Sequence, residues 1–138
     1  MTNQKSFLII DDDVDDQEIF AAAVEELDDD IRCITAFDCD EALDFLKKNM
    51  DELPDYIFLD LNMPRVNGRQ CLVELKKLPG VRDVPIVIYS TSSLKKDMEE
   101  TLEMGASHFL VKPSKFDELC GALKQLLASD YTMSKLEN

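Results

Sequence analysis

The stretch FLIIDDDVDDQEIFAAAVEEL, residues 7–27, joins a short apolar run, a cluster of acids and a segment with helical spacing. The run 7–10 is too short for a helix and stops at aspartates, which is typical of a buried strand. In the segment after the acids, apolar residues recur on one helical face: Ile19, Phe20, Ala23, Val24 and Leu27. This part of the chain therefore predicts a strand, a turn and a helix, in that order.

The same alternation recurs along the rest of the chain. Strands are expected at residues 6–10, 31–37, 55–59, 85–89 and 107–111. Later helices are expected at about 40–49 and 68–78, on the stripe of Leu94, Met98 and Leu102, and on a last apolar face from Phe116 to Leu127. Strands that alternate with helices form a parallel sheet covered on both faces, and the second strand is the one with polar residues interleaved, as at an edge. We therefore predict a flavodoxin-like (βα)5 doubly wound sheet with strand order 2-1-3-4-5.

The composition is that of a water-soluble folded domain with a large excess of acids. The chain has 138 residues, of which 45% are hydrophobic and 32% charged, and 29 acids against 15 Lys and Arg give a net charge of −14. Such a surface repels phosphate backbones and anionic lipids, so direct nucleic-acid or membrane binding is disfavoured. We expect a cytoplasmic protein, with a domain over residues 1–128, a C-terminal tail over 129–138 and no output domain.

The four cysteines form no CxxC pair, and the chain has a single histidine, so a structural zinc site is not expected. In a cytosolic protein the thiols are expected to be reduced and to serve mostly as small core residues.

Polar side chains follow four of the five expected strands. Asp11 and Asp12 follow the first strand, Asp60 the third, Ser90 the fourth and Lys112 the fifth. In open α/β sheets, ligands bind beyond the carboxyl ends of the strands. Carboxylates gathered at one point repel each other unless a hard cation lies between them, and a set of oxygen ligands favours Mg²⁺, or Mn²⁺, over zinc. A lysine and a hydroxyl opposite the ion suit phosphoryl oxygens, so this edge predicts a phosphoryl site.

The chain resembles response regulator receiver domains, the phospho-accepting half of two-component systems. The resemblance runs from Phe7 to about Leu127 and is carried by four motifs in order: FLII followed by acids, YIFLDLNMPRVNG, PIVIY followed by a hydroxyl residue, and GASHFLVKP. The acids after the first strand and the segment 79–85 are similar to those of single-domain regulators that work beside bacterial phytochromes.

The resemblance implies a role for each residue at the expected site. Asp60 would accept the phosphoryl group as an aspartyl phosphate, and the domain would catalyse its own phosphorylation and dephosphorylation rather than act as an enzyme on other substrates. Mg²⁺ would be held by Asp11 and Asp12 with the Asp60 carboxylate and the backbone carbonyl of Asn62. Lys112 would pair with the phosphoryl oxygens, helped by a cis peptide bond before Pro113.

The resemblance also implies how the signal would leave the site. Ser90 would donate a hydrogen bond to the phosphoryl group, and Phe109 on the fifth strand would turn into the space behind it. This would reshape the face made by the fourth helix, fifth strand and fifth helix for binding of a downstream protein. The donor would be a sensor histidine kinase or a histidine phosphotransferase, and the protein would be a monomer or a weak homodimer.

The same residues allow two other interpretations. The run from Phe7 to Val14 also fits the first motif of haloacid-dehalogenase-like phosphatases, in which Asp11 would be the nucleophile, but no cap domain or later acids are evident. A flavodoxin would need a Ser/Thr/Gly phosphate loop where aspartates stand. Asp13, Asp15 and Asp16 are expected to form a solvated acidic first turn, favoured by the helix dipole.

Overall fold

The computed structural model describes residues 5–28, 30–63 and 67–137, with side chains as far as Ala128. Its centre is a parallel five-stranded sheet in the order β2-β1-β3-β4-β5, as predicted. The strands are β1 (Ser6–Ile10), β2 (Arg32–Ala36), β3 (Tyr56–Leu59), β4 (Ile86–Ser90) and β5 (His108–Val111). All four neighbouring pairs are parallel, so the carboxyl ends of the strands lie along one edge.

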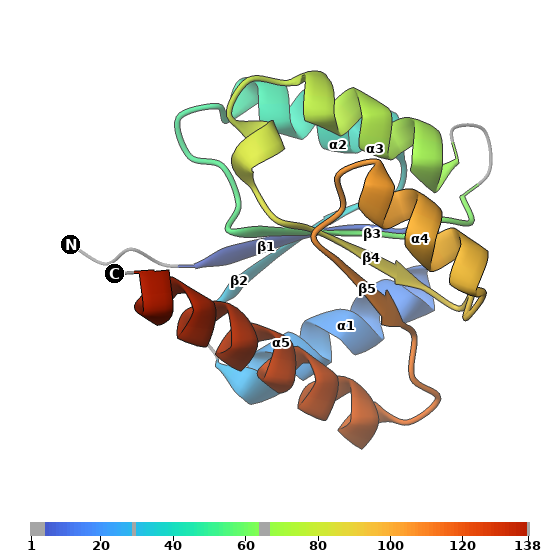
Figure 1. The fold of residues 1–138 in the computed structure, drawn as a ribbon, viewed down its shortest axis with the longest axis vertical. Coiled ribbons are helices and arrows are strands. Elements are labelled where there is room, and N and C mark those ends of the chain that lie inside the picture. Colours follow the sequence, from blue (N-terminus) through green and yellow to red (C-terminus); the bar gives the residue numbers. More distant parts are fainter. Residues whose placement is uncertain (1–4, 29, 64–66, 138) are drawn as a thin grey trace.

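Helices cover both faces of this sheet (Figure 1). α1 (Val14–Leu27) and α5 (Phe116–Glu137) lie side by side on one face, and α2 (Cys39–Lys48), α3 (Gly68–Lys77) and α4 (Lys95–Glu103) lie on the other. A short 3₁₀ helix, η1 (Val81–Asp83), precedes β4. One apolar core lies beneath α1 and α5 and the other beneath α2 and α3, which is the three-layer arrangement expected of alternating strands and helices.

The burial of the strands explains their order. Residues 7–10 of β1 are fully buried and β3 is buried throughout, whereas Arg32 and Thr35 of β2 are exposed. A strand with helices on both faces must be apolar along its whole length, and an edge strand need not be. The interleaved polar residues of β2 therefore predicted its position correctly.

Side-chain caps begin three of the helices. The carboxylates of Asp13 and Asp38 accept hydrogen bonds from the backbone N–H of Asp16, at 3.1 Å, and Glu41, at 2.8 Å. The Asn67 side chain accepts one from the N–H of Gln70 at 2.9 Å. These caps satisfy backbone donors that a helix start leaves open.

Two local expectations differ from the structure. α5 continues to Glu137, through residues 129–137 that were expected to form a tail, while Asn138 lies outside the described residues. Cys39 and Cys71 are joined in a disulfide with a Cα–Cα distance of 5.7 Å, and Cys33 and Cys120 remain free thiols. Cys39 and Cys71 are core residues as expected, but the prediction of reduced thiols was wrong for this pair. They are 32 residues apart, so only the packing of α2 against α3 brings them together.

Within the described part of the chain, no helix is both long enough and apolar enough to cross a membrane.

Candidate functional site

Three carboxylates meet at the carboxyl edge of the sheet. Asp11 and Asp12 follow β1, Asp60 follows β3, and the two strands are direct neighbours in register, with Ile10 opposite Leu59. One carboxylate oxygen from each acid lies within 4.8 Å of the other two. Asp11 is fully buried, Asp60 is 6% exposed, and Asp12 is open to solvent. The structure thus brings together the three acids that the sequence placed at one site.

Backbone hydrogen bonds hold Asp11 and Asp60 in place. The N–H of Asp60 donates to the carbonyl of Ile10 at 3.0 Å, and the Asp60 Oδ1 accepts from the N–H of Asn62 at 3.2 Å. The Oδ1 of Asp11 accepts from the N–H of Asp13 at 3.0 Å. Gln17, which the sequence analysis did not single out, is buried and donates to the carbonyl of Asp11 at 2.7 Å. Its polarity within the apolar face of α1 was the available signal.

Lys112 is the cation of the site. Its Nζ donates to Asp11 Oδ2 at 2.8 Å and to Asp16 Oδ2 at 2.7 Å, and it lies 3.8 Å from Asp60 Oδ2. Only 9% of the lysine side chain is exposed. The expected cis bond before Pro113 is absent, because the described residues contain no cis peptide bond. The N–H of Lys112, directly after β5, donates to the Ser90 carbonyl at 2.7 Å.

Asp16 is the main departure from the expected site. It was expected in a solvated first turn, but its carboxylate forms an ion pair with Lys112 and is 32% exposed. Asp15, the neighbouring acid, is exposed as predicted, and Asp13 caps α1. The sequence could not separate these three acids, because only the packing of α1 against the sheet decides which of them reaches the lysine.

The surroundings shift the pKa values of Asp60 and Lys112. Burial raises the pKa of Asp60 from 3.8 to about 6, and Lys112 opposes this rise while Asp11 adds to it. Burial by itself would lower the pKa of Lys112, but its hydrogen bonds to Asp11 and Asp16 raise that pKa overall. The lysine is therefore a permanent cation, whereas the Asp60 carboxyl holds its proton more tightly than an exposed aspartate.

Ser90 lies at the end of β4 and is fully buried. Its Oγ accepts hydrogen bonds from the N–H of Ser92 at 3.2 Å and from the Asn62 side-chain amide at 3.4 Å. Phe109 is half-buried on β5 and packs against the core beneath α2 and α3. Through Asn62, Ser90 is connected to Asp60. Phe109 lies one strand away, where it pairs in register with Ile88, two residues before Ser90 on β4.

A second polar cluster joins α3 to α4 near Ser90. The Ser92 hydroxyl donates to Asp97, whose other oxygen accepts from the Arg69 guanidinium. Arg69 also donates through Nε to Glu100 Oε2 at 3.0 Å. These contacts were not predicted, because the two made by Arg69 join residues 28 and 31 positions apart and none of the four residue types is unusual at a protein surface. These polar contacts help to hold α4 against α3, because Thr101 is the one residue of α4 that is buried.

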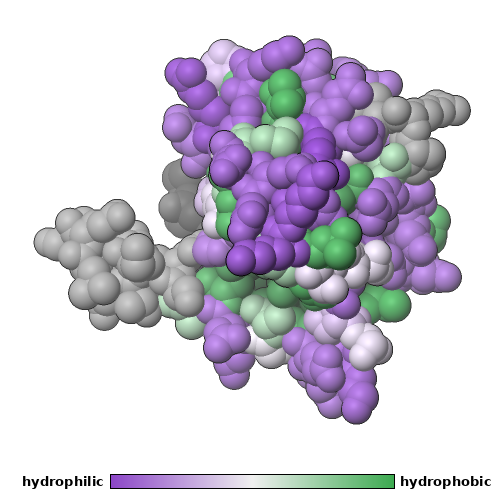
Figure 2. All heavy atoms as spheres, turned by 45° about the vertical axis from the view of Figure 1, so that its right-hand side comes forward, coloured by the Kyte–Doolittle hydropathy of each residue, from purple (hydrophilic) through white to green (hydrophobic). Residues whose placement is uncertain are grey.

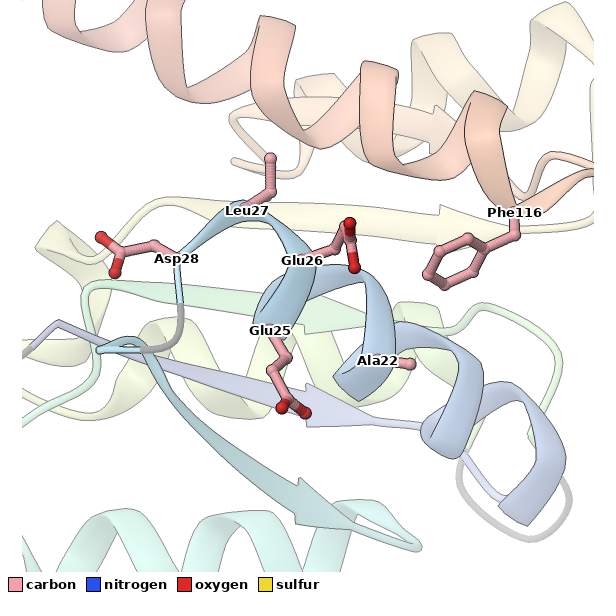
Figure 3. Close-up of a pocket in the computed structure, with 6 residues that line it drawn as sticks. All are labelled: Ala22, Glu25, Glu26, Leu27, Asp28 and Phe116. Carbon is pink, nitrogen blue, oxygen red and sulfur yellow. The ribbon is translucent and has the colours of Figure 1, made fainter.

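A groove between α1 and α5 lies apart from this site (Figure 3). Its wall carries Glu25, Glu26 and Asp28, and Phe116 projects into it from the first turn of α5. Its lining contains none of the clustered carboxylates and no lysine.

The donor set at the sheet edge fits a hard divalent cation. Three carboxylates converge there without histidine or cysteine, and carboxylate oxygens are the ligands of Mg²⁺ and Mn²⁺. The site also contains the Lys112 amine and the Ser90 hydroxyl, which are groups of the kind that contact phosphoryl oxygens.

Comparisons with known proteins agree with this geometry. The family model described as "Response regulator receiver domain" matches residues 7–124. Protein PilG of Pseudomonas aeruginosa is 31% identical over 113 residues, which cover 80% of this chain and 82% of PilG. Several other curated relatives are longer proteins, and this chain spans about half of their length.

Two solved structures resemble the chain over most of its length. The Mn²⁺-bound form of response regulator Rcp1 has a TM-score of 0.75 and 25% identity, with 88% of this chain and 91% of that chain covered. The phosphorylated cyanobacterial phytochrome response regulator RcpA has a TM-score of 0.78 and 25% identity, with coverages of 89% and 91%. The chain belongs to the response regulator receiver domain family.

Proposed function

We propose that Asp60 accepts a phosphoryl group from a histidine kinase or a histidine phosphotransferase. The observation that carries this proposal is the meeting of Asp60 with Asp11, Asp12 and Lys112 within one partly buried cluster. A carboxylate oxygen of Asp60 would attack phosphorus as the phosphorus–nitrogen bond of the donor phosphohistidine breaks, and the imidazole would leave. The product is an acyl phosphate on Asp60.

Mg²⁺, or Mn²⁺, bound by Asp11, Asp12, Asp60 and the backbone carbonyl of Asn62 would neutralise charge on the transferring group. Lys112 and Ser90 would supply the other contacts to the transferring group. Lys112 offers a fixed cation to the phosphoryl oxygens, and the Ser90 hydroxyl, which now accepts two hydrogen bonds, has its proton available to donate. The positions of both groups allow the domain to promote its own phosphorylation and dephosphorylation.

The output of the site would be a change in the face made by α4, β5 and α5. Few apolar contacts hold α4 in this face, because Leu94 and Leu102 are 65% and 45% exposed and Thr101 alone is buried in α4. The surface in the view of Figure 2 is mostly hydrophilic, with apolar patches between the hydrophilic residues. When Ser90 moves toward the phosphoryl group, Phe109 would turn inward and the face would become competent for a downstream protein. With a net charge of −14, a protein partner is favoured over nucleic acid or membrane.

The proposal is tested with acetyl phosphate and Mg²⁺, using the intact mass of the wild type, Asp60→Asn and Asp11→Asn. The wild type should gain one phosphoryl group that hydroxylamine or base removes, and Asp60→Asn should gain none. Equal labelling of wild type and Asp60→Asn would refute the assignment. An adduct located by peptide mapping at Asp11 would instead indicate a phosphatase of the haloacid-dehalogenase type.

The proposed switch has its own test, which is hydrogen exchange with and without phosphorylation. Residues 91–111 should change their exchange rates on phosphorylation. If this segment exchanges at the same rates in both forms, the assigned output face is wrong.

A further inference from the structure

Lys112 is bound by a carboxylate outside the expected receiver site. Its Nζ lies 2.7 Å from Asp16 Oδ2, closer than it lies to Asp11 at 2.8 Å or to Asp60 at 3.8 Å. Asp16 is in the first turn of α1, and its backbone N–H is bound to the capping carboxylate of Asp13 at 3.1 Å. Asp16 is therefore a partner that the N-terminal cap of α1 holds in position.

Asp16 takes one of the hydrogen-bond donors of Lys112. An ammonium has three N–H donors, and two of them are used by Asp11 and Asp16. The 3.8 Å between Nζ and Asp60 Oδ2 exceeds a hydrogen bond, so Lys112 and Asp60 are near each other without direct contact. This gap lies where an oxygen of a phosphoryl group on Asp60 would have to enter.

Loss of the Asp16 carboxylate would remove the force that maintains the gap. Lys112 is almost fully buried, so its attraction to Asp60 is only weakly screened. With one of its two charge-assisted hydrogen bonds gone, the ammonium would close on Asp60 and form a direct ion pair. That pair would occupy the position of the incoming oxygen and reduce the negative charge on the attacking carboxylate.

We propose that Asp16 is a positioning residue that holds Lys112 back from Asp60, which keeps the acceptor carboxylate free and aims the third donor at the phosphoryl oxygens. The inference rests on the proposed function, because it assigns Asp16 a role in phosphoryl acceptance at Asp60. Asp16 itself touches neither the acceptor nor the incoming group and acts only through Lys112.

The chain offers a matched control one residue away. Asp15 carries the same charge in the same turn of α1, is exposed, and forms no ion pair within the described residues. Asp15→Ala and Asp16→Ala therefore remove equal charge near the site, and only Asp16→Ala removes a contact to Lys112. Alanine is favourable in a helix, so both variants are expected to fold.

The experiment measures Asp60 phosphorylation by acetyl phosphate at saturating Mg²⁺ in wild type, Asp15→Ala, Asp16→Ala and Asp16→Glu. Asp16→Ala should lower the maximal rate constant at least about fivefold relative to Asp15→Ala, because small displacements of a positioning group are costly. The half-saturating acetyl phosphate concentration should differ by less than about twofold between the two alanine variants, since both lose one charge. Asp16→Glu should recover part of the rate, because its carboxylate can still reach Nζ.

The contact itself is followed without phosphorylation, through the ¹H–¹⁵N signal of the Lys112 ammonium. That signal should be observable and slowly exchanging in the wild type and Asp15→Ala, and shifted in Asp16→Ala. A wild type that takes no phosphoryl group would refute the proposed function. A wild type that is labelled normally, with Asp16→Ala as fast as Asp15→Ala or Asp16→Glu as slow as Asp16→Ala, would overturn only the role of Asp16.

Discussion

Replacing Asp60 with asparagine should make the metal-free protein more stable at neutral pH. Asp60 is 6% exposed and lies beside Asp11 and Asp12, so its ionised form is penalised by both burial and repulsion. Asparagine has nearly the same shape, and its side-chain oxygen can still accept the hydrogen bond from the Asn62 N–H. The substitution therefore removes the buried charge and keeps the local geometry.

The magnitude follows from the pKa of this carboxyl, which is raised from 3.8 in the unfolded chain to about 6 in the fold. Each pKa unit corresponds to about 1.4 kcal/mol, so the ionised carboxylate costs the folded state about 3 kcal/mol. The folded protein binds the Asp60 proton more tightly than the unfolded chain does, and this tighter binding stabilises the fold fully below the unfolded pKa. The stabilisation is lost as pH rises through the folded pKa. The stability difference between Asp60→Asn and wild type should grow across that window and level off above it.

The assay is urea unfolding followed by circular dichroism, in EDTA, at several values between about pH 4 and about pH 7.5. An exposed acid in the turn after α2 supplies the control, since Asp51→Asn removes the charge of a carboxylate that is not buried. Mg²⁺ should stabilise the wild type by about 1.4 kcal/mol per tenfold excess over its dissociation constant, and stabilise Asp60→Asn less. A difference between Asp60→Asn and wild type that stays constant with pH, or an Asp60→Asn protein that is less stable at pH 7.5, would refute this reasoning.

Three further predictions concern the packing around the site. Gly68→Ala should destabilise the protein by about 2 kcal/mol in urea unfolding and impair phosphorylation, because the added methyl would clash with the Leu61 backbone and lie 2.5 Å from the Asp60 carbonyl oxygen. Reduction of the Cys39–Cys71 disulfide should lower the free energy of unfolding by about 4 kcal/mol for the loop that it closes, measured with and without dithiothreitol; an unchanged midpoint would contradict the disulfide. Arg69→Met should speed hydrogen exchange in α4, which Arg69 ties to α3, whereas Lys95→Met at an exposed ion pair should not; equal effects of the two would contradict the tie.

Most of the fold could be predicted because the strands differ so clearly in polarity. β1 and β3 are unbroken apolar runs and are buried throughout their central positions, while β2 carries exposed residues. The sequence pattern was less informative where no change in polarity marks a boundary. The end of α5 is such a place, since residues 129–137 are a mixture of polar and apolar types that either a tail or a helix could contain.

Some contacts of the candidate site could be predicted from the sequence and others could not. Asp60 and Lys112 follow strands and Ser90 ends one, and these strand ends must share one edge of the sheet, so the meeting of the three residues follows from topology. The contact between Asp16 and Lys112 depends on how α1 is rotated against the sheet, and no spacing rule encodes it. The disulfide is similar, because Cys39 and Cys71 meet only once α2 and α3 are packed.

A chain of hydrogen bonds connects Asp60 to α4 through Asn62, Ser90 and Ser92. The Ser90 Oγ is bound by the N–H of Ser92, and the Ser92 hydroxyl donates to Asp97, which Arg69 also holds. A phosphoryl group that drew Ser90 toward Asp60 would pull on Ser92 and so weaken the link at the start of α4. Because few apolar side chains fix this helix, polar bonds make up much of what holds it, and their loss should move it more than the loss of similar bonds would move the better-packed α3.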